Sequence, residues 1–143
     1  MKHWIPTAAL LLAFPVFAAA PAPADQIRAG EAVYSRCLAC HALAYDRTGP
    51  HHCGLLGRRA GSVPGFAYSA PMKASDIVWN ARNLDRFLQN PARMVPGTTM
   101  GYAGVADKAE RSALIAYLKS ADQAPECKAL ASKSQITPAK TGK

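Results

Sequence analysis

The sequence predicts an all-α fold in a single domain. Three segments carry apolar residues at helical spacing, and no segment alternates apolar and polar residues as a half-buried strand would. The folded core is predicted to span residues 25–127, a length that suits one compact domain. We therefore expect helices joined by loops, without a sheet.

The first two predicted helices each carry an apolar stripe. The first spans residues 26–37, where Gly30 permits close contact with another helix and the inward-facing residues are Ile27, Val33 and Tyr34. The second begins at Asn83 and ends near Pro91, and its stripe consists of Leu84, Phe87 and Leu88.

The third predicted helix begins after Asp107. Glu110 follows three residues later, and the pair resembles a capping box with Asp in place of Ser or Thr. The residues that this helix is expected to bury by their period are Leu114, Ile115 and Leu118.

Residues 1–18 are predicted to be a secretory signal peptide rather than part of the fold. Lys2 gives a positive start, an apolar run follows over residues 8–17, and small residues precede a cleavage site after Ala18. Cleavage after Ala24 is one alternative, and an uncleaved anchor is another, although the run is short for a membrane span. We expect a periplasmic protein whose domain occupies residues 19–127.

The net charge of +8 lies mainly outside the predicted core. Residues 25–127 contain 12 Lys/Arg and 9 Asp/Glu, a net charge of +3, whereas residues 128–143 contain four lysines and no acid. We predict a flexible basic tail there. Because basic residues do not gather among aromatics in the core, we expect no nucleic-acid partner. The tail is either simply solvated or in peripheral contact with anionic membrane lipid or an acidic partner.

Cys37, Cys40 and His41 form a C-x-x-C-H motif, the pattern of c-type haem attachment. Two thiols three positions apart on a helical turn can add to the two vinyl groups of one porphyrin, and the next residue then directs its imidazole at the iron. A zinc-binding structural module is the rival interpretation, but the second ligand pair that such a site needs is missing. The single motif predicts one covalent haem c.

Cys53 and Cys127 belong to no second attachment motif. In an oxidising compartment two remaining thiols most simply form one disulfide, and two free buried cysteines are the alternative.

A second iron ligand is expected 59 residues after His41, at Met100. This residue follows Pro96, Gly97 and two threonines, in a turn able to wrap over a haem. Met72 and Met94 are competitors, although a methionine in a short domain usually fills the core. A thioether ligand raises the reduction potential relative to a second imidazole.

These features together resemble a class I cytochrome c, the family of the mitochondrial protein and its bacterial relatives. The similarity covers about residues 27–119 and includes Gly30-Glu31 with Tyr34, Thr48-Gly49-Pro50, Gly54-Leu55-Leu56-Gly57-Arg58, Pro64-Gly65-Phe66-Ala67-Tyr68-Ser69, Trp79, Asn90-Pro91 and Leu114-Ile115-Ala116-Tyr117-Leu118-Lys119. The resemblance implies helices and Ω-loops wrapped around one covalently bound haem, with Gly30 and Tyr34 against Leu114 and Tyr117.

The resemblance also assigns roles around the haem. The Pro50 carbonyl would accept a hydrogen bond from the second nitrogen of His41, which fixes the ligand's tautomer. Tyr102 would cover the exposed haem edge. Buried propionates need donors or a cation, and the residues implied to surround them are Arg58, Tyr68, Ser69, Trp79 and Thr98.

Some positions depart from the family pattern. Phe87 stands where relatives often have a tyrosine and Met72 where an amide is common, so we expect a drier haem pocket. Around the haem edge Arg36 and Arg93 persist, while lysines are absent at Ala92, Thr99, Ala106 and Asp107. Because charge complementarity mainly sets the encounter rate, a partner less acidic than the mitochondrial oxidase is expected.

The predicted function is one-electron transfer between ferric and ferrous iron across the haem edge near Cys37, Cys40 and Tyr102. We expect a monomer that is not an enzyme and that exchanges electrons with redox proteins, namely an oxidase, a reductase complex or a periplasmic dehydrogenase. The alternative is a haem-based ligand-binding sensor or peroxidase-like enzyme with an open sixth position, against which Met100 argues.

Overall fold

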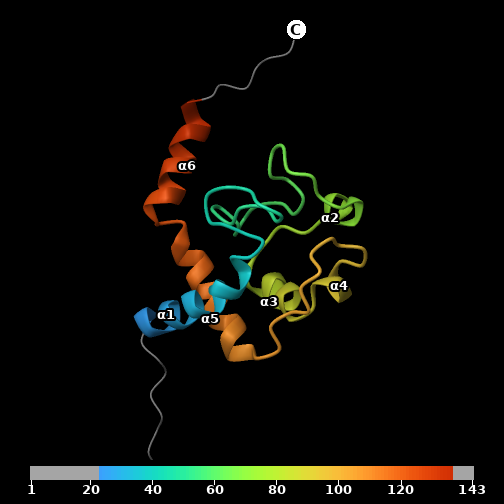
Figure 1. The fold of residues 1–143 in the computed structure, drawn as a ribbon, viewed down its shortest axis with the longest axis horizontal. Coiled ribbons are helices and arrows are strands. Elements are labelled where there is room, and N and C mark those ends of the chain that lie inside the picture. The colour runs from blue at the N-terminus through green and yellow to red at the C-terminus, as the bar shows by residue number, and fades with distance from the viewer. Residues whose placement is uncertain (1–22, 137–143) are drawn as a thin grey trace, which may run out of the picture.

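The structure is a computed structural model that describes residues 23–136 (Figure 1). The predicted signal peptide and the last seven residues of the predicted tail, 137–143, lie outside this range. The elements are α1 (Pro23–Tyr34), the 3-10 helix η1 (Ser35–Cys37), α2 (Ala70–Ala74), α3 (Ala81–Gln89), α4 (Pro91–Met94), α5 (Lys108–Ala121) and α6 (Pro125–Ile136).

The described part of the chain is helical, as the sequence predicts. Its only strand-like pairing is one isolated bridge between Arg59 and Val78. Within residues 23–136 we find no helix with the length and apolar character needed to cross a membrane.

Helices α1 and α5 lie against each other at the base of the fold (Figure 1). Gly30 makes the close approach possible, because a Cβ atom there would sit 2.7 Å from the Cβ of Tyr117 and would also overlap the Ala113 carbonyl. The ring of Tyr34 packs on that of Tyr117, with centroids 5.1 Å apart. The predicted contact of Gly30 and Tyr34 with Tyr117 is confirmed, and the group that a Cβ atom at Gly30 would meet first is the Ala113 carbonyl.

The ends of α3 and α5 follow from side-chain capping. Asn80, not Asn83, is the N-cap of α3; Asn83 stands three residues later, and each side chain accepts a hydrogen bond from the other's backbone N–H. Asp107 caps α5 as predicted by accepting from the Glu110 N–H at 2.8 Å. The Glu110 carboxylate does not complete a capping box, since it pairs with Arg36.

Residues 125–136 form helix α6, where the sequence analysis expected a flexible tail from Lys128 onward. Pro125 ends the preceding turn but is itself well suited to the first position of a new helix, because its missing N–H has no partner there. Alanine, lysine and leucine then supply good helix propensity. Cys127 is buried and forms a disulfide with Cys53, with Cα atoms 5.2 Å apart. The first turn of α6 is thereby attached to the loop that follows Pro50.

The segment between η1 and α2 has no helix and folds as successive turns (Figure 1). Backbone hydrogen bonds fix its path: the Gly49 N–H donates to the Cys40 carbonyl at 2.7 Å, and the Ala60 N–H donates to the Ile77 carbonyl at 2.8 Å. This segment therefore stays close to the attachment motif while it crosses to the α2–α3 side of the molecule.

Candidate functional site

A largely apolar cavity of about 500 Å³ lies between the turn-rich segment, α3, α5 and the loop before α5. All eleven residues that the sequence analysis proposed for the site line it. They are Cys37, Cys40, His41, Pro50, Arg58, Tyr68, Ser69, Trp79, Thr98, Met100 and Tyr102. Residues far apart in the sequence thus meet around one space that is suited to a large planar ligand.

The attachment motif occupies one turn at the end of η1. The N–H groups of Cys40 and His41 both donate to the Cys37 carbonyl, at 3.1 and 2.9 Å. Cys37 is half-buried, Cys40 is exposed, and neither sulfur is in a disulfide. Burial raises the pKa of the Cys37 thiol above its usual value. Both thiols are thus presented at the cavity, free to form thioether bonds.

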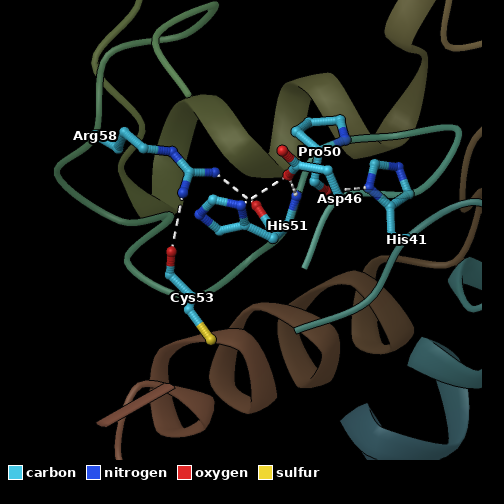
Figure 2. A network of polar contacts seen from close by, with 6 residues as sticks. All are labelled: His41, Asp46, Pro50, His51, Cys53 and Arg58. Carbon is cyan, nitrogen blue, oxygen red and sulfur yellow. Dashed lines mark hydrogen bonds and ion pairs between the residues drawn. The ribbon is translucent and has the colours of Figure 1, made fainter. Parts of the chain in front are cut away.

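His41 is held in one tautomer by the backbone. Its Nδ1–H donates to the Pro50 carbonyl at 2.7 Å (Figure 2), so the lone pair belongs to Nε2. Burial lowers the pKa of the imidazole, and the Pro50 bond opposes that shift in part. His41 is therefore presented as a neutral nitrogen ligand, which is the form that a metal ion requires.

Gly49 packs against the His41 ring. A Cβ atom at this position would sit 2.6 Å from both ring nitrogens, closer than real Cβ contacts allow. Only glycine can therefore occupy this position while Pro50 keeps its bond to His41.

The Gly49→Ala variant is expected to lose about 1–3 kcal/mol of stability through overpacking, and its haem spectrum should lose low-spin intensity because the imidazole is displaced. Gly30→Ala is the matched control, because its Cβ would strike Ala113 and Tyr117 rather than His41. It should lower the melting temperature and leave the low-spin spectrum unchanged. Equal spectra in the two variants would contradict the role given to Gly49.

Two of the three candidate methionines are placed to be the second iron ligand. Met100 and Met72 line the cavity and Met94 does not. Met72 is buried within the short helix α2, whereas Met100 is half-buried in a loop. That loop is shaped by Gly97 at φ +84°, by the Thr98 N–H bond to the Val95 carbonyl and by the Met100 N–H bond to Thr98 Oγ1. The turn expected before Met100 is therefore present.

Two polar side chains in the cavity lining, Ser69 and Arg58, are suited to meet a carboxylate. Among the residues that the structure describes, Ser69 Oγ is the only buried side-chain polar atom without a hydrogen-bond partner. The Arg58 guanidinium is half-buried, and burial lowers its pKa. Its two terminal nitrogens donate to the carbonyls of Cys53 and His51, at 2.9 and 2.8 Å (Figure 2). A buried hydroxyl without a partner and a half-buried guanidinium, both in the cavity lining, suit a buried carboxylate, as a haem propionate would supply.

The cavity is also lined by residues that were not predicted for the site, and His52 and Tyr34 are two of them. The sequence predicts Tyr34 only as a helix-packing residue and does not predict His52 as part of the site, yet both border the cavity. No motif around either residue indicates a place at the cavity, because that place depends on how the loop containing His52 folds back toward His41.

The comparisons with known proteins agree with this geometry. The family model described as cytochrome c matches residues 27–122. The chain belongs to the cytochrome c family. Cytochrome c2 of Blastochloris viridis is 42% identical over 103 residues, covering 70% of this chain and 81% of that protein. Cytochrome c of Tetrahymena pyriformis is 47% identical over 100 residues, covering 68% and 91%.

The fold is shared as well. Cytochrome cH from Methylobacterium extorquens superimposes with a TM-score of 0.64 at 36% identity, covering 66% of this chain and 97% of that one. Members of the cytochrome c family carry one covalent haem c and transfer electrons rather than catalyse reactions on substrates. The chain is therefore a cytochrome c-family electron carrier with the all-α fold of class I.

Proposed function

We propose that the protein is a periplasmic one-electron carrier in which Cys37 and Cys40 hold the haem and His41 and Met100 ligate its iron. The observation that supports this most strongly is that all four side chains line the same cavity. The haem supplies an iron centre that cycles between Fe(III) and Fe(II). The residues of the chain hold it, exclude water and set the charge around it.

The cavity walls favour the reduced iron. Phe87 and Met72 are buried and line the cavity, and the ring of Trp79 packs on Phe87 with centroids 5.0 Å apart. Apolar walls and a thioether ligand both disfavour the extra positive charge of ferric iron. On the proximal side, the Pro50 carbonyl orients His41 and strengthens it as a ligand. Ser69, Arg58, Tyr68, Trp79 and Thr98 are proposed to surround the propionates.

Electrons are proposed to enter and leave near Cys40 and Tyr102, where lining residues reach the surface. The one charged group among the exposed lining residues is Arg36, and its guanidinium is paired with Glu110 at 2.8 Å. This weakly charged opening fits a redox partner that is less acidic than the mitochondrial oxidase. An oxidase, a reductase complex or a periplasmic dehydrogenase remains the proposed class of partner, and the protein is proposed to act as a monomer.

The proposed periplasmic location has two supports. The sequence begins with the pattern of a signal peptide. Cys53 and Cys127 form a disulfide in the structure, and disulfides persist in oxidising compartments.

A visible spectrum of the purified holoprotein tests the proposed function. We expect haem that survives denaturing extraction, a low-spin six-coordinate ferric spectrum, and full conversion to the ferrous form by a one-electron reductant. A high-spin ferric spectrum would instead support a ligand-binding sensor or peroxidase-like enzyme, and a protein without a Soret band would support a zinc module.

Truncation after Lys128 tests the basic segment at the C-terminus. Beyond this residue the described side chains of α6 are exposed, except for half-buried Leu130. Because the truncated chain keeps Cys127, we expect a nearly unchanged spectrum and melting temperature. Loss of basic residues should weaken binding to vesicles containing anionic lipid if the segment contacts membranes. A large loss of stability would show that the segment packs on the domain.

A further inference from the structure

The imidazole of His52 stacks on that of His41. The two ring centroids are 4.3 Å apart and the planes differ by 21°. His51, the adjacent histidine, is used differently: its Nδ1 and backbone N–H both contact Asp46 Oδ1, at 2.7 and 2.8 Å (Figure 2). Of the two neighbouring histidines, only His52 thus lies against the proposed iron ligand and borders the cavity.

His52 is itself fixed on two sides. Its Nδ1 lies 3.1 Å from the Tyr34 hydroxyl, and the Tyr34 ring meets its edge with centroids 5.6 Å apart. Its backbone N–H donates to the Leu43 carbonyl at 3.0 Å. Tyr34 is 3% exposed and rests on Tyr117 of α5. A continuous set of contacts therefore runs from the packed helix pair, through Tyr34 and His52, to His41.

The surroundings of His52 and Tyr34 favour the uncharged form of each side chain. Burial lowers the pKa of His52 well below its usual value, and the nearby His41, Arg58 and His51 shift it in the same direction. Burial is also the main reason that the pKa of Tyr34 is raised. A neutral imidazole can stack on His41 without charge repulsion, and a protonated phenol can hydrogen-bond to it.

The bond to Pro50 alone does not define the plane of His41. A hydrogen bond at Nδ1 fixes a direction within the imidazole plane, but the ring can still rock about that line. A flat side chain against the face of the ring opposes this motion, provided that it is itself held in place. Contacts beyond the direct ligand are known to set ring orientation at metal sites.

We propose that His52, held by the Tyr34 hydroxyl, is a positioning residue that fixes the plane of the His41 imidazole. The inference rests on the proposed function, in which His41 is the iron ligand. In ferric low-spin haem the orientation of the ligating imidazole, together with that of the second ligand, sets how the unpaired electron is distributed over the porphyrin, and variants at Tyr34 and His52 leave the second ligand unchanged. The haem methyl shifts in proton NMR and the g values in electron paramagnetic resonance therefore report the position of the ring.

The test uses ferric holoprotein and variants that separate the hydrogen bond from the stacking. Tyr34→Phe removes only the hydroxyl, His52→Phe keeps a flat ring that cannot accept the bond, and His52→Leu removes the flat ring. Tyr45→Phe is the control for loss of a phenol, since Tyr45 is 64% exposed. His51→Phe is the control for loss of a histidine, because its side chain contacts Asp46 rather than His41.

We expect shifted haem methyl resonances and g values in Tyr34→Phe, a larger shift in His52→Leu, and wild-type values in both controls. Because the hydroxyl is proposed to act through His52, adding Tyr34→Phe to His52→Phe should produce no further shift. Wild-type spectra in both Tyr34→Phe and His52→Leu would overturn the proposal. Failure of the proposed function is a separate result, since the unmodified protein would then lack the low-spin signal altogether.

Discussion

Replacing Met100 by alanine is expected to abolish the weak long-wavelength absorption band of methionine-ligated ferric haem and to convert the spectrum to high spin. Met100 lines the cavity from a loop shaped by Gly97 and Thr98. Loss of the thioether removes a ligand that favours ferrous iron, so the reduction potential should fall by a share of the roughly 0.8 V that axial ligands span. Visible spectra and a redox titration measure both effects.

Two methionine variants serve as controls for this experiment. Met94 does not line the cavity, so Met94→Leu should keep both the band and the potential. Met72 lines it from α2 and is 7% exposed, so Met72→Leu is a nearly volume-conserving core change that should keep the band. Disappearance of the band in Met72→Leu, with retention in Met100→Ala, would reverse the ligand assignment.

The parts of the site that the sequence predicts are those encoded over a few neighbouring residues. Cys37, Cys40 and His41 share one turn, and the Gly97 turn places Met100 in a loop. The bond from His41 to Pro50 joins residues nine positions apart and came from the family resemblance rather than from spacing. Apolar periodicity likewise located α3 and α5, because a helix that packs on one face repeats its apolar residues every three or four positions.

The features that the sequence did not predict depend on tertiary contacts, or on neighbouring residues that are equally suited to the same role. Nothing in the sequence around His52 indicates a contact with His41. The contact exists because the loop folds back onto His41 and the Tyr34 hydroxyl holds His52 in place. Asn80 and Asn83 are both good caps, and only the path of the preceding chain shows which one begins α3. Helix α6 has the polar composition of a tail, so the sequence predicts the disulfide from Cys53 to Cys127 but not the helix that begins beside it.

Replacing both Cys53 and Cys127 by alanine is expected to lower the free energy of unfolding by about 4 kcal/mol, since the crosslink closes a long loop in the unfolded chain. The two residues are separated by 74 positions, and both are buried in the folded protein. The measurement is urea unfolding of the holoprotein followed by its haem spectrum. A single variant at either position would leave an unpaired thiol, so the double variant is the cleaner comparison.

The two segments that the disulfide joins have a second connection. The Gly54 N–H donates to Asp122 Oδ1 at 2.7 Å, and the Cys53 carbonyl accepts from Arg58 on the other side. These bonds hold the loop in place without the disulfide, so the double alanine variant should keep its low-spin spectrum. The first turn of helix α6 is held to the loop by the disulfide at Cys127, so the amides of α6 should exchange faster with deuterium in the double variant than in the wild-type protein. Asp122→Ala is the matched control and should cost only about 1 kcal/mol.

Intact mass under denaturing, non-reducing conditions establishes whether the bond is present in the purified protein. Oxidised, haem-bearing protein treated with an alkylating reagent should gain no alkyl group at Cys53 or Cys127, and digestion should release one peptide pair that contains both. Two alkylated cysteines would contradict the disulfide. The crosslink restricts the unfolded chain however the folded loop is held, so removing it should lower the urea midpoint. If the bond is present and the midpoint of the double alanine variant is unchanged, strain in the folded protein offsets this entropic stabilisation.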